Sequence, residues 1–368
     1  MMKVCHLSSV HFRYDTRILL KECISLRKNG YEVHLVVADG KGDEIFDGVH
    51  IHDVGKPKSM LNRFTKTTKA VYHKGFALDA NIYHFHDTEL IPVGLRLVKK
   101  GKKVIYDSHE DLPREIMSKE YIPGFLRKPV SVLVELYEDL AVKKFDFVIT
   151  ATPHIRKRFA KLNKATMDVN NYPLLSELNT ETTDWANKKN EVCYVGNITQ
   201  IRGLEQVIDA MELLKGIRLN LAGSFAPNTF KENLERRKGW EKTNFLGQID
   251  RSEVKRVLRD SQVGIVTFLP AGNHTHSQPN KLFEYMAQGI PLVASNFDLW
   301  KDIIEKVDCG ICIDPKDPVE ISKAIKVFLD DKASAQRMGE NGRNAVLNTY
   351  NWKPEEKKLL GIYAKLET

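Results

Sequence analysis

The stretch Pro279–Ala294, PNKLFEYMAQGIPLVA, has the pattern of a helix that leads directly into a buried strand. Its proline suits a helix start, Gly289 suits a helix end, and Pro291–Ala294 is an apolar run. A helix start leaves backbone N–H groups free and favours an anion, for which a diphosphate is the natural ligand. Glu284 follows one turn later, where its carboxylate can accept both hydroxyls of a ribose. The alternative is an ordinary helix with a surface glutamate.

Short apolar runs alternate with amphipathic stretches along most of the chain, which is the pattern of βαβ units. In the first half, strands are expected at 3–8, 32–38, 82–86, 103–107 and 147–150, and helices at 16–29, 90–100 and 130–144. In the second half, strands are expected at 192–195, 218–222, 244–246, 263–268, 291–294 and 310–313, and helices at 204–215, 229–238, 252–261, 280–288 and 319–330.

These units predict an α/β protein with two Rossmann-like domains facing a cleft, because such sheets bind ligands at the carboxyl ends of their strands. A polar stretch from Asn170 to Asn190 separates the two series. We therefore place the first domain at 1–168 and the second at 172–349. Ser252 is the expected N-cap of the helix at 252–261.

The composition excludes several classes of protein. The chain has 368 residues, and no apolar run reaches the ~18 residues of a transmembrane helix. The first residues read as a strand rather than a signal peptide, so the expected location is the cytoplasm. Five scattered cysteines argue against a disulfide framework. Cys309 and Cys312 form a C-x-x-C pair inside an apolar run, which favours buried strand cysteines over a metal or redox site.

The net charge of +8 lies entirely in the first half of the chain. Residues 1–168 hold 29 Lys and Arg against 21 Asp and Glu, whereas the remainder holds 27 of each sign. Such an excess of positive charge is typical of proteins that bind nucleic acid, an anionic membrane or phosphorylated substrates. The segment 56–74 has six cations and no acids, and Leu61, Phe64 and Val71 share one helical face. It suits contact with an anionic bilayer, and a solvated charged face is the alternative. No motif supports nucleic acid.

A second motif is YVGNITQIRGL, at 194–204. A strand ends at Gly196, a loop follows, and Arg202 stands just before the next helix. Such a loop can approach a phosphate closely, and the guanidinium can clamp it through two hydrogen bonds. The alternative is a surface arginine.

The run Ala287-x-Gly289-x-Pro291-Leu-Val-Ala after Glu284 resembles the signature of the family-4 glycosyltransferases, retaining enzymes of the two-domain GT-B fold. The resemblance implies that Glu284 binds the ribose of a nucleotide sugar. The family's first signature glutamate is replaced by His276, and its first diphosphate-binding cation by Asn197. The implied donor-binding residues are Gly196, Asn197, Arg202, His276, Ser277, Gln278, Asn280, Lys281, Leu282 and Glu284. The resemblance also implies a last helix, 350–368, that packs back on the first domain.

The family places a functional histidine after the strand at 103–107, a role that falls on His109. Catalytic roles are therefore expected for His109 and Arg202. His86 and Asp87 follow the preceding strand and are second candidates, for the acceptor side. The nearby histidines suggest zinc, but they lack any recognised ligand spacing, so no metal is expected.

The loop at 8–18 lacks the G-x-G-x-x-G of a dehydrogenase. Its Asp-Thr-Arg-Ile run resembles a variant found in one branch of the family, where the loop adjoins the donor phosphate and the acceptor. Arg13 and Arg17 are thus candidate anion ligands on the acceptor or phosphate side, together with Asp15. The alternative is that Asp15 caps the helix and Arg17 is solvated.

The sequence therefore predicts a retaining glycosyltransferase that moves a sugar from a nucleoside diphosphate to a hydroxyl of a lipid-linked or polysaccharide acceptor. By family analogy the new bond forms on the face that the diphosphate leaves. Arg202, Lys281 and the start of the Asn280 helix would stabilise that leaving group without a metal or other cofactor. The alternatives are a nucleotide-sugar epimerase, which needs no acceptor, and a basic nucleic-acid-binding or scaffold protein.

Overall fold

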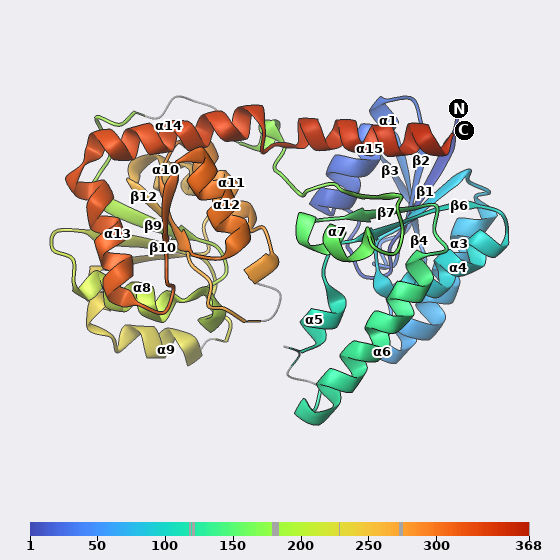
Figure 1. Cartoon of the computed structure of the whole chain (residues 1–368), viewed down its shortest axis with the longest axis horizontal. Coiled ribbons are helices and arrows are strands. Elements are labelled where there is room, and N and C mark those ends of the chain that lie inside the picture. Colours follow the sequence, from blue (N-terminus) through green and yellow to red (C-terminus); the bar gives the residue numbers. More distant parts are fainter. Residues whose placement is uncertain (118, 120–121, 179–183, 228, 272–274, 368) are drawn as a thin grey trace. The chain divides into compact units, whose positions relative to one another are not determined.

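The computed structural model describes the chain except for residues 118, 120–121, 179–183, 228, 272–274 and 368. The chain divides into two compact units, which are treated separately below (Figure 1). The first unit comprises Met1–Asn171 with Trp352–Thr368, and the second comprises Tyr172–Asn351.

The first unit is built on an eight-stranded sheet with the order β3-β4-β2-β1-β5-β6-β7-β8. All neighbouring strands run parallel except β3, which pairs antiparallel with β4. The strands are β1 (Lys3–Leu7), β2 (Glu32–Val37), β3 (Glu44–Phe46), β4 (Val49–Asp53), β5 (Ile82–Phe85), β6 (Lys103–Ser108), β7 (Phe147–Thr150) and β8 (Thr166–Asp168). The five strands expected from the sequence are confirmed, and β3, β4 and β8 are additional.

Helices connect these strands. They are η1 (Thr16–Cys23), α1 (Ile24–Lys28), α2 (Met60–Asn62), η2 (Arg63–Thr67), α3 (Thr68–Ala77), η3 (Thr88–Leu90), α4 (Ile91–Lys99), α5 (Leu112–Ile116), α6 (Gly124–Val142) and α7 (Pro153–Phe159). The first of them, η1, has wider π-type turns and continues into α1. The long helix α6 begins earlier than the expected range of 130–144.

The last helix, α15 (Trp352–Leu366), belongs to the first unit, although it follows the second along the chain (Figure 1). The indole nitrogen of Trp352 donates to Ser25 Oγ at 2.9 Å. The backbone N–H of Asn170 donates to Glu355 at 2.8 Å, and Tyr363 lies fully buried beside β5. These buried polar contacts fix α15 along its whole length.

The second unit has a six-stranded, fully parallel sheet with the order β11-β10-β9-β12-β13-β14. The strands are β9 (Glu191–Val195), β10 (Arg218–Ala222), β11 (Thr243–Gly247), β12 (Val263–Val266), β13 (Leu292–Ser295) and β14 (Gly310–Ile313). The helices are η4 (Leu175–Glu177), η5 (Gln200–Arg202), α8 (Leu204–Glu212), α9 (Thr229–Glu235), η6 (Lys238–Lys242), α10 (Arg251–Asp260), α11 (Asn280–Ala287), α12 (Asp298–Val307), α13 (Pro318–Asp330) and α14 (Lys332–Asn348). Both units have the doubly wound α/β architecture that the sequence predicts.

One expected cap is corrected by the structure. The N-cap of α10 is Asp250, not Ser252. The Asp250 carboxylate accepts hydrogen bonds from the backbone N–H groups of Ser252 and Glu253, at 2.8 and 2.9 Å. Glu253 reaches back to the N–H of Asp250, which completes a capping box. An aspartate at this position therefore satisfies more of the free N–H groups than Ser252 would.

Across the described ranges of the chain, no helix combines the length and the apolar composition needed to cross a bilayer.

Candidate active site

Two cations of the second unit are held against aromatic rings at the end of β9. The ammonium of Lys281, in the first turn of α11, lies 3.7 Å from the ring centre of Tyr194. The guanidinium carbon of Arg202 lies 3.9 Å from the ring centre of Phe268. Because a ring face attracts a cation without neutralising it, both charges stay available to an anion.

Gly196 brings the loop close to these cations. It has φ +132°, and a Cβ at this position would lie 3.2 Å from Lys281 Nζ. The backbone N–H of Val195 donates to the Tyr285 hydroxyl at 2.8 Å, which fixes the end of β9 against α11. The glycine thus permits a close approach of the loop to the helix start.

Three buried polar atoms, one on Arg202 itself and two on residues close to Arg202 or Lys281 along the chain, have no hydrogen-bond partner among the described residues. They are Nε of Arg202, Oγ1 of Thr199 and Oε1 of Gln278. Each such atom costs about 1–3 kcal/mol when it stays unpaired. Their position in the loop after β9 and in the loop before α11 fits a site that a polar ligand completes.

Burial and the neighbouring Arg202 lower the pKa of Lys281 to about 7, and the nearby Glu284 carboxylate opposes this shift. A bound phosphate would favour the ammonium form and raise the pKa. The protonation of Lys281 is therefore coupled to anion binding near neutral pH.

A pocket of about 320 Å³ lies in the same unit, beside Glu284. Its apolar walls include Pro173, Val195, Val254 and Leu258, and Arg251, Lys255, Glu284 and Gln288 line it with polar groups. The volume lies at the lower end of the usual range for small-molecule sites. The carboxylate of Glu284 and the apolar walls thus line one pocket.

The sequence analysis missed these walls and the two rings beneath the cations. Arg251 and Val254 lie on α10, far from the motifs, and nothing in the local sequence marks them. Val195 and Tyr194 directly precede Gly196, so their place at a strand end was the available signal.

The remaining donor-site candidates lie on the two loops and in the first turns of α11. Asn197 and Asn280 are exposed, whereas His276, Ser277 and Gln278 are half-buried. The Ser277 carbonyl accepts a hydrogen bond from Trp300 Nε1 at 2.6 Å, which ties its loop to α12. The donor-binding role predicted for Leu282 does not fit, because its side chain is buried in the core and its N–H donates to Pro279.

In the first unit, the candidate His109 is held by Asp107, the fully buried carboxylate near the end of β6. His109 Nε2 donates to Asp107 Oδ2 at 2.9 Å, and Arg17 donates to both carboxylate oxygens at 3.0 and 2.9 Å. Burial alone would raise the pKa of Asp107, but Arg17 and His109 outweigh burial and hold it well below its usual value. Because an ionised carboxylate only accepts, His109 Nε2 carries the proton of this hydrogen bond.

His86 adjoins this pair but is itself buried. Its Nδ1 lies 3.2 Å from Asp107 Oδ2 and 3.2 Å from His109 Nε2. Asp87 accepts hydrogen bonds from Ser8 Oγ at 2.9 Å and the backbone N–H of Ser9 at 2.5 Å. Both residues thus fix the loop after β1 and the setting of His109, and an acceptor role for them stays a prediction.

Arg13 and Arg17 are buried, and carboxylates of their own unit already pair with them. Arg13 contacts Asp39 at 2.7 Å and Glu44 at 3.0 Å. Asp15 caps η1 by accepting from the N–H groups of residues 17 and 18. The capping alternative for Asp15 therefore fits the structure, but Arg17 is not solvated. This geometry favours a structural role for both arginines and gives no support to anion binding.

Comparisons with known proteins match both units. The family model "Glycosyltransferase Family 4" matches residues 17–169, and "Glycosyl transferases group 1" matches residues 176–345. A glycogen synthase from Mycobacterium tuberculosis is 26% identical over 169 residues, which are 44% of this chain and 39% of that protein. A mannosyltransferase from Mycolicibacterium hassiacum is 23% identical over 170 residues, 45% of this chain and 40% of that protein. The chain thus matches less than half the length of these curated relatives.

Solved structures resemble the whole chain. A sucrose-phosphate synthase from Thermosynechococcus elongatus aligns with a TM-score of 0.77 and 17% identity, over 100% of this chain and 99% of that chain. Anabaena HepE in complex with UDP-glucose aligns with a TM-score of 0.72 and 14% identity, over 99% of this chain and 100% of that chain. At these identities the likeness concerns the fold. Taken with the two family models and the site residues, it shows that this chain belongs to the family-4 glycosyltransferases and has their GT-B fold.

Proposed function

We propose that this glycosyltransferase retains the configuration of a sugar that it moves from a nucleoside diphosphate to a hydroxyl of a lipid-linked or polysaccharide acceptor. The observation that carries the proposal is the pair of ring-held cations, Lys281 and Arg202, at the start of α11. The pocket beside Glu284, on the same helix, has room for a nucleoside. HepE, solved with UDP-glucose, and the glycogen synthase relative support a nucleotide-sugar donor.

In the proposed reaction the diphosphate gains negative charge as its bond to the sugar breaks. Arg202, Lys281 and the free N–H groups that open α11 stabilise that charge, so the transfer itself needs no metal. By family analogy, the acceptor hydroxyl attacks on the face that the diphosphate leaves, with the leaving phosphate assisting. By the same analogy, His109 acts on the reacting sugar, and Asp107 holds its imidazole in position for this role.

A thermal-shift assay with UDP, ADP and GDP tests the donor site. At least one of them is expected to raise the Tm by several degrees, because a ligand at 100 times its Kd stabilises by about 2.7 kcal/mol. Glu284→Ala is expected to lower the affinity for that nucleotide at least ~10-fold, since it removes a charged hydrogen-bond acceptor. Pyrophosphate, which has no ribose, is expected to bind the variant as it binds the wild type.

Glu305→Ala, at an exposed position of α12, is the matched control. It is expected to leave the affinity for the nucleotide and for pyrophosphate unchanged. If no nucleoside diphosphate raises the Tm, the assignment of a donor site to these residues is wrong. If Glu284→Ala binds nucleotide as tightly as the wild type, only the ribose assignment fails. Conversion of a nucleotide sugar to its epimer, with no acceptor present, would favour the epimerase instead.

We also propose that the basic segment 56–74 contacts an anionic membrane. Leu61, Phe64 and Val71, which were expected to share one exposed helical face, do not all lie at the surface. Val71 is buried in the core, whereas Leu61 and Phe64 are 74% and 50% exposed. Met60 is also exposed, at 58%. These apolar side chains lie among the six cations of the segment, which is the combination that binds the interface of an anionic bilayer.

Liposome flotation tests this contact. The protein is expected to float with vesicles that contain phosphatidylserine at low salt, and much less at 0.5 M salt, because salt screens exposed charges. Leu61→Glu with Phe64→Glu is expected to reduce flotation several-fold. Ile45→Glu, at another exposed apolar position of this unit, is the control and should float normally. Equal flotation of the two variants would refute a role for this segment.

A further inference from the structure

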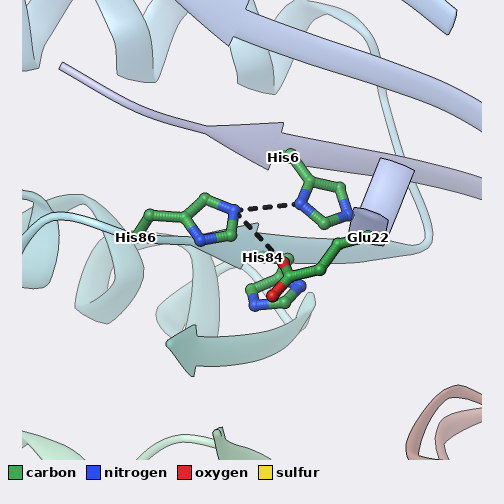
Figure 2. Close-up of side chains that lie close together, drawn as sticks. All are labelled: His6, Glu22, His84 and His86. Carbon is green, nitrogen blue, oxygen red and sulfur yellow. Dashed lines mark hydrogen bonds and ion pairs between the residues drawn. The ribbon is translucent and has the colours of Figure 1, made fainter. Parts of the chain in front are cut away.

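Four side chains with metal-binding atoms meet in the core of the first unit (Figure 2). They are His6 on β1, Glu22 on η1, His84 on β5 and His86 just after β5. His86 is 3% exposed and the other three are fully buried. One ligand atom of each lies within 4.8 Å of the others.

The sheet brings these residues together. β1 and β5 are neighbouring parallel strands, and His6 pairs with His84 in their register. His84 and His86 are two residues apart, so both side chains lie on one face of the sheet. Glu22 reaches the same point from η1. The positions 6, 22, 84 and 86 form no recognised ligand spacing along the chain, and for that reason no metal is expected from the sequence alone.

Each of the three imidazoles has one ring nitrogen held by a neighbour. His6 Nε2 and His84 Nδ1 lie 3.2 and 2.8 Å from the Tyr363 hydroxyl, whose oxygen can accept from both. His86 Nδ1 lies 3.2 Å from Asp107 Oδ2. Histidines that bind a metal are oriented in this way, by a hydrogen bond from the ring nitrogen that does not face the metal.

The other ring nitrogens are the candidate metal ligands, and a metal would replace the hydrogen bond that His6 Nδ1 and His86 Nε2 share. His6 Nδ1 lies 2.9 Å from His86 Nε2, which lies 4.0 Å from Glu22 Oε2. His84 Nε2 and Glu22 Oε2 are buried and have no hydrogen-bond partner among the described residues, whereas Glu22 Oε1 forms an ion pair with Arg17. Metal–ligand bonds of about 2.0–2.1 Å in a tetrahedral site imply ligand separations of ~3.3 Å. The two observed separations bracket that value.

The charges at this point favour a cation. Two fully buried carboxylates, Glu22 and Asp107, share the single guanidinium of Arg17, at 3.1 and 2.9 Å. A divalent cation would stabilise Glu22 in its ionised form.

We propose that His6, His84, His86 and Glu22 bind one Zn²⁺ ion. Three imidazoles and a carboxylate are ligands that zinc prefers, and four protein ligands leave no open position, as in a structural site. The ion would join β1, β5 and η1, and through Tyr363 it would fix α15. The ligands belong to the first unit and the donor cations to the second, and the ion would be a structural metal that the proposed transfer chemistry does not use.

The metal content of untagged, full-length protein tests this proposal. After extensive dialysis, mass spectrometry of the digested protein is expected to find about one zinc per chain. Glu22→Gln and His84→Asn are each expected to lower the affinity for zinc at least ~10-fold, measured in competition with a chromophoric chelator. His52→Asn is the control, because His52 belongs to a separate, more exposed histidine group with His34. It is expected to retain the metal.

Two measurements on the wild type cover the case in which a variant fails to fold. Cobalt-substituted protein is expected to show the intense visible absorption of tetrahedral Co²⁺. Removal of zinc by a chelator is expected to lower the Tm by several degrees, and added Zn²⁺ to restore it. A wild-type protein without bound zinc or a cobalt spectrum, and with a Tm that no chelator changes, would overturn the proposal. Loss of zinc in His52→Asn alone would do so too.

Discussion

Replacing Lys281 with methionine is expected to lower kcat for sugar transfer by about 10²–10³-fold, because it removes a positive charge from the leaving diphosphate. Methionine keeps most of the side-chain volume, so the contact with the Tyr194 ring is retained while the charge is lost. The measurement is steady-state transfer, or donor hydrolysis when no acceptor is known. A kcat within threefold of the wild type would contradict the proposed role.

The same substitution is expected to remove a pH dependence. In the free protein Lys281 has a pKa of about 7, so its ammonium is lost as the pH rises above 7. Because a diphosphate binds the protonated form, its affinity for the wild type is expected to fall by up to ~10-fold per pH unit above 7. Calorimetry in buffers of different ionisation enthalpy would detect the linked proton uptake.

Lys301, an exposed lysine of α12, supplies the control for both experiments. Lys301→Met is expected to keep the kcat and the pH dependence of the wild type. If Lys281→Met binds diphosphate with an unchanged pH profile, another group carries the titration.

Replacing Arg17 with methionine is expected to destabilise the first unit by about 3–5 kcal/mol. The guanidinium is 4% exposed and pairs with Asp107 and Glu22, so its loss leaves two buried carboxylates without their cation. It also donates to the Val169 carbonyl at 2.8 Å. Hydrogen exchange of the β1 and β5 amides under increasing urea would report this loss within the first unit.

The double variant Arg17→Met with Asp107→Asn is expected to recover part of the stability, because it removes one of the unpaired charges. Lys28→Met, at an exposed position of α1, should change stability by less than ~0.5 kcal/mol. If Arg17→Met proved as stable as Lys28→Met, the buried ion pair would have no structural importance.

Most strands and helices of both sheets follow from the sequence, because their periodicity is local and glycine or proline marks their ends. Some of the elements that were not predicted from the sequence are short or locally weak. β3 and β8 have three residues each, too few to show alternation. Helix α14 contains Gly339 and Gly342, which disfavour a helix in isolation. The packing requires them: a Cβ at Gly339 would lie 2.1 Å from the carbonyl oxygen of Gly289.

The candidate site divides in the same way. The sequence by itself determined the helix start at Asn280, the glycine at the end of β9 and the place of Glu284, because each is set by its neighbours along the chain. Only the tertiary structure decided which groups meet in space: the rings beneath Lys281 and Arg202, the carboxylates that occupy Arg13 and Arg17, and the histidine cluster of β1 and β5. Those contacts join residues tens of positions apart. Strand order and side-chain packing fix them, and the local pattern of a sequence does not contain that information.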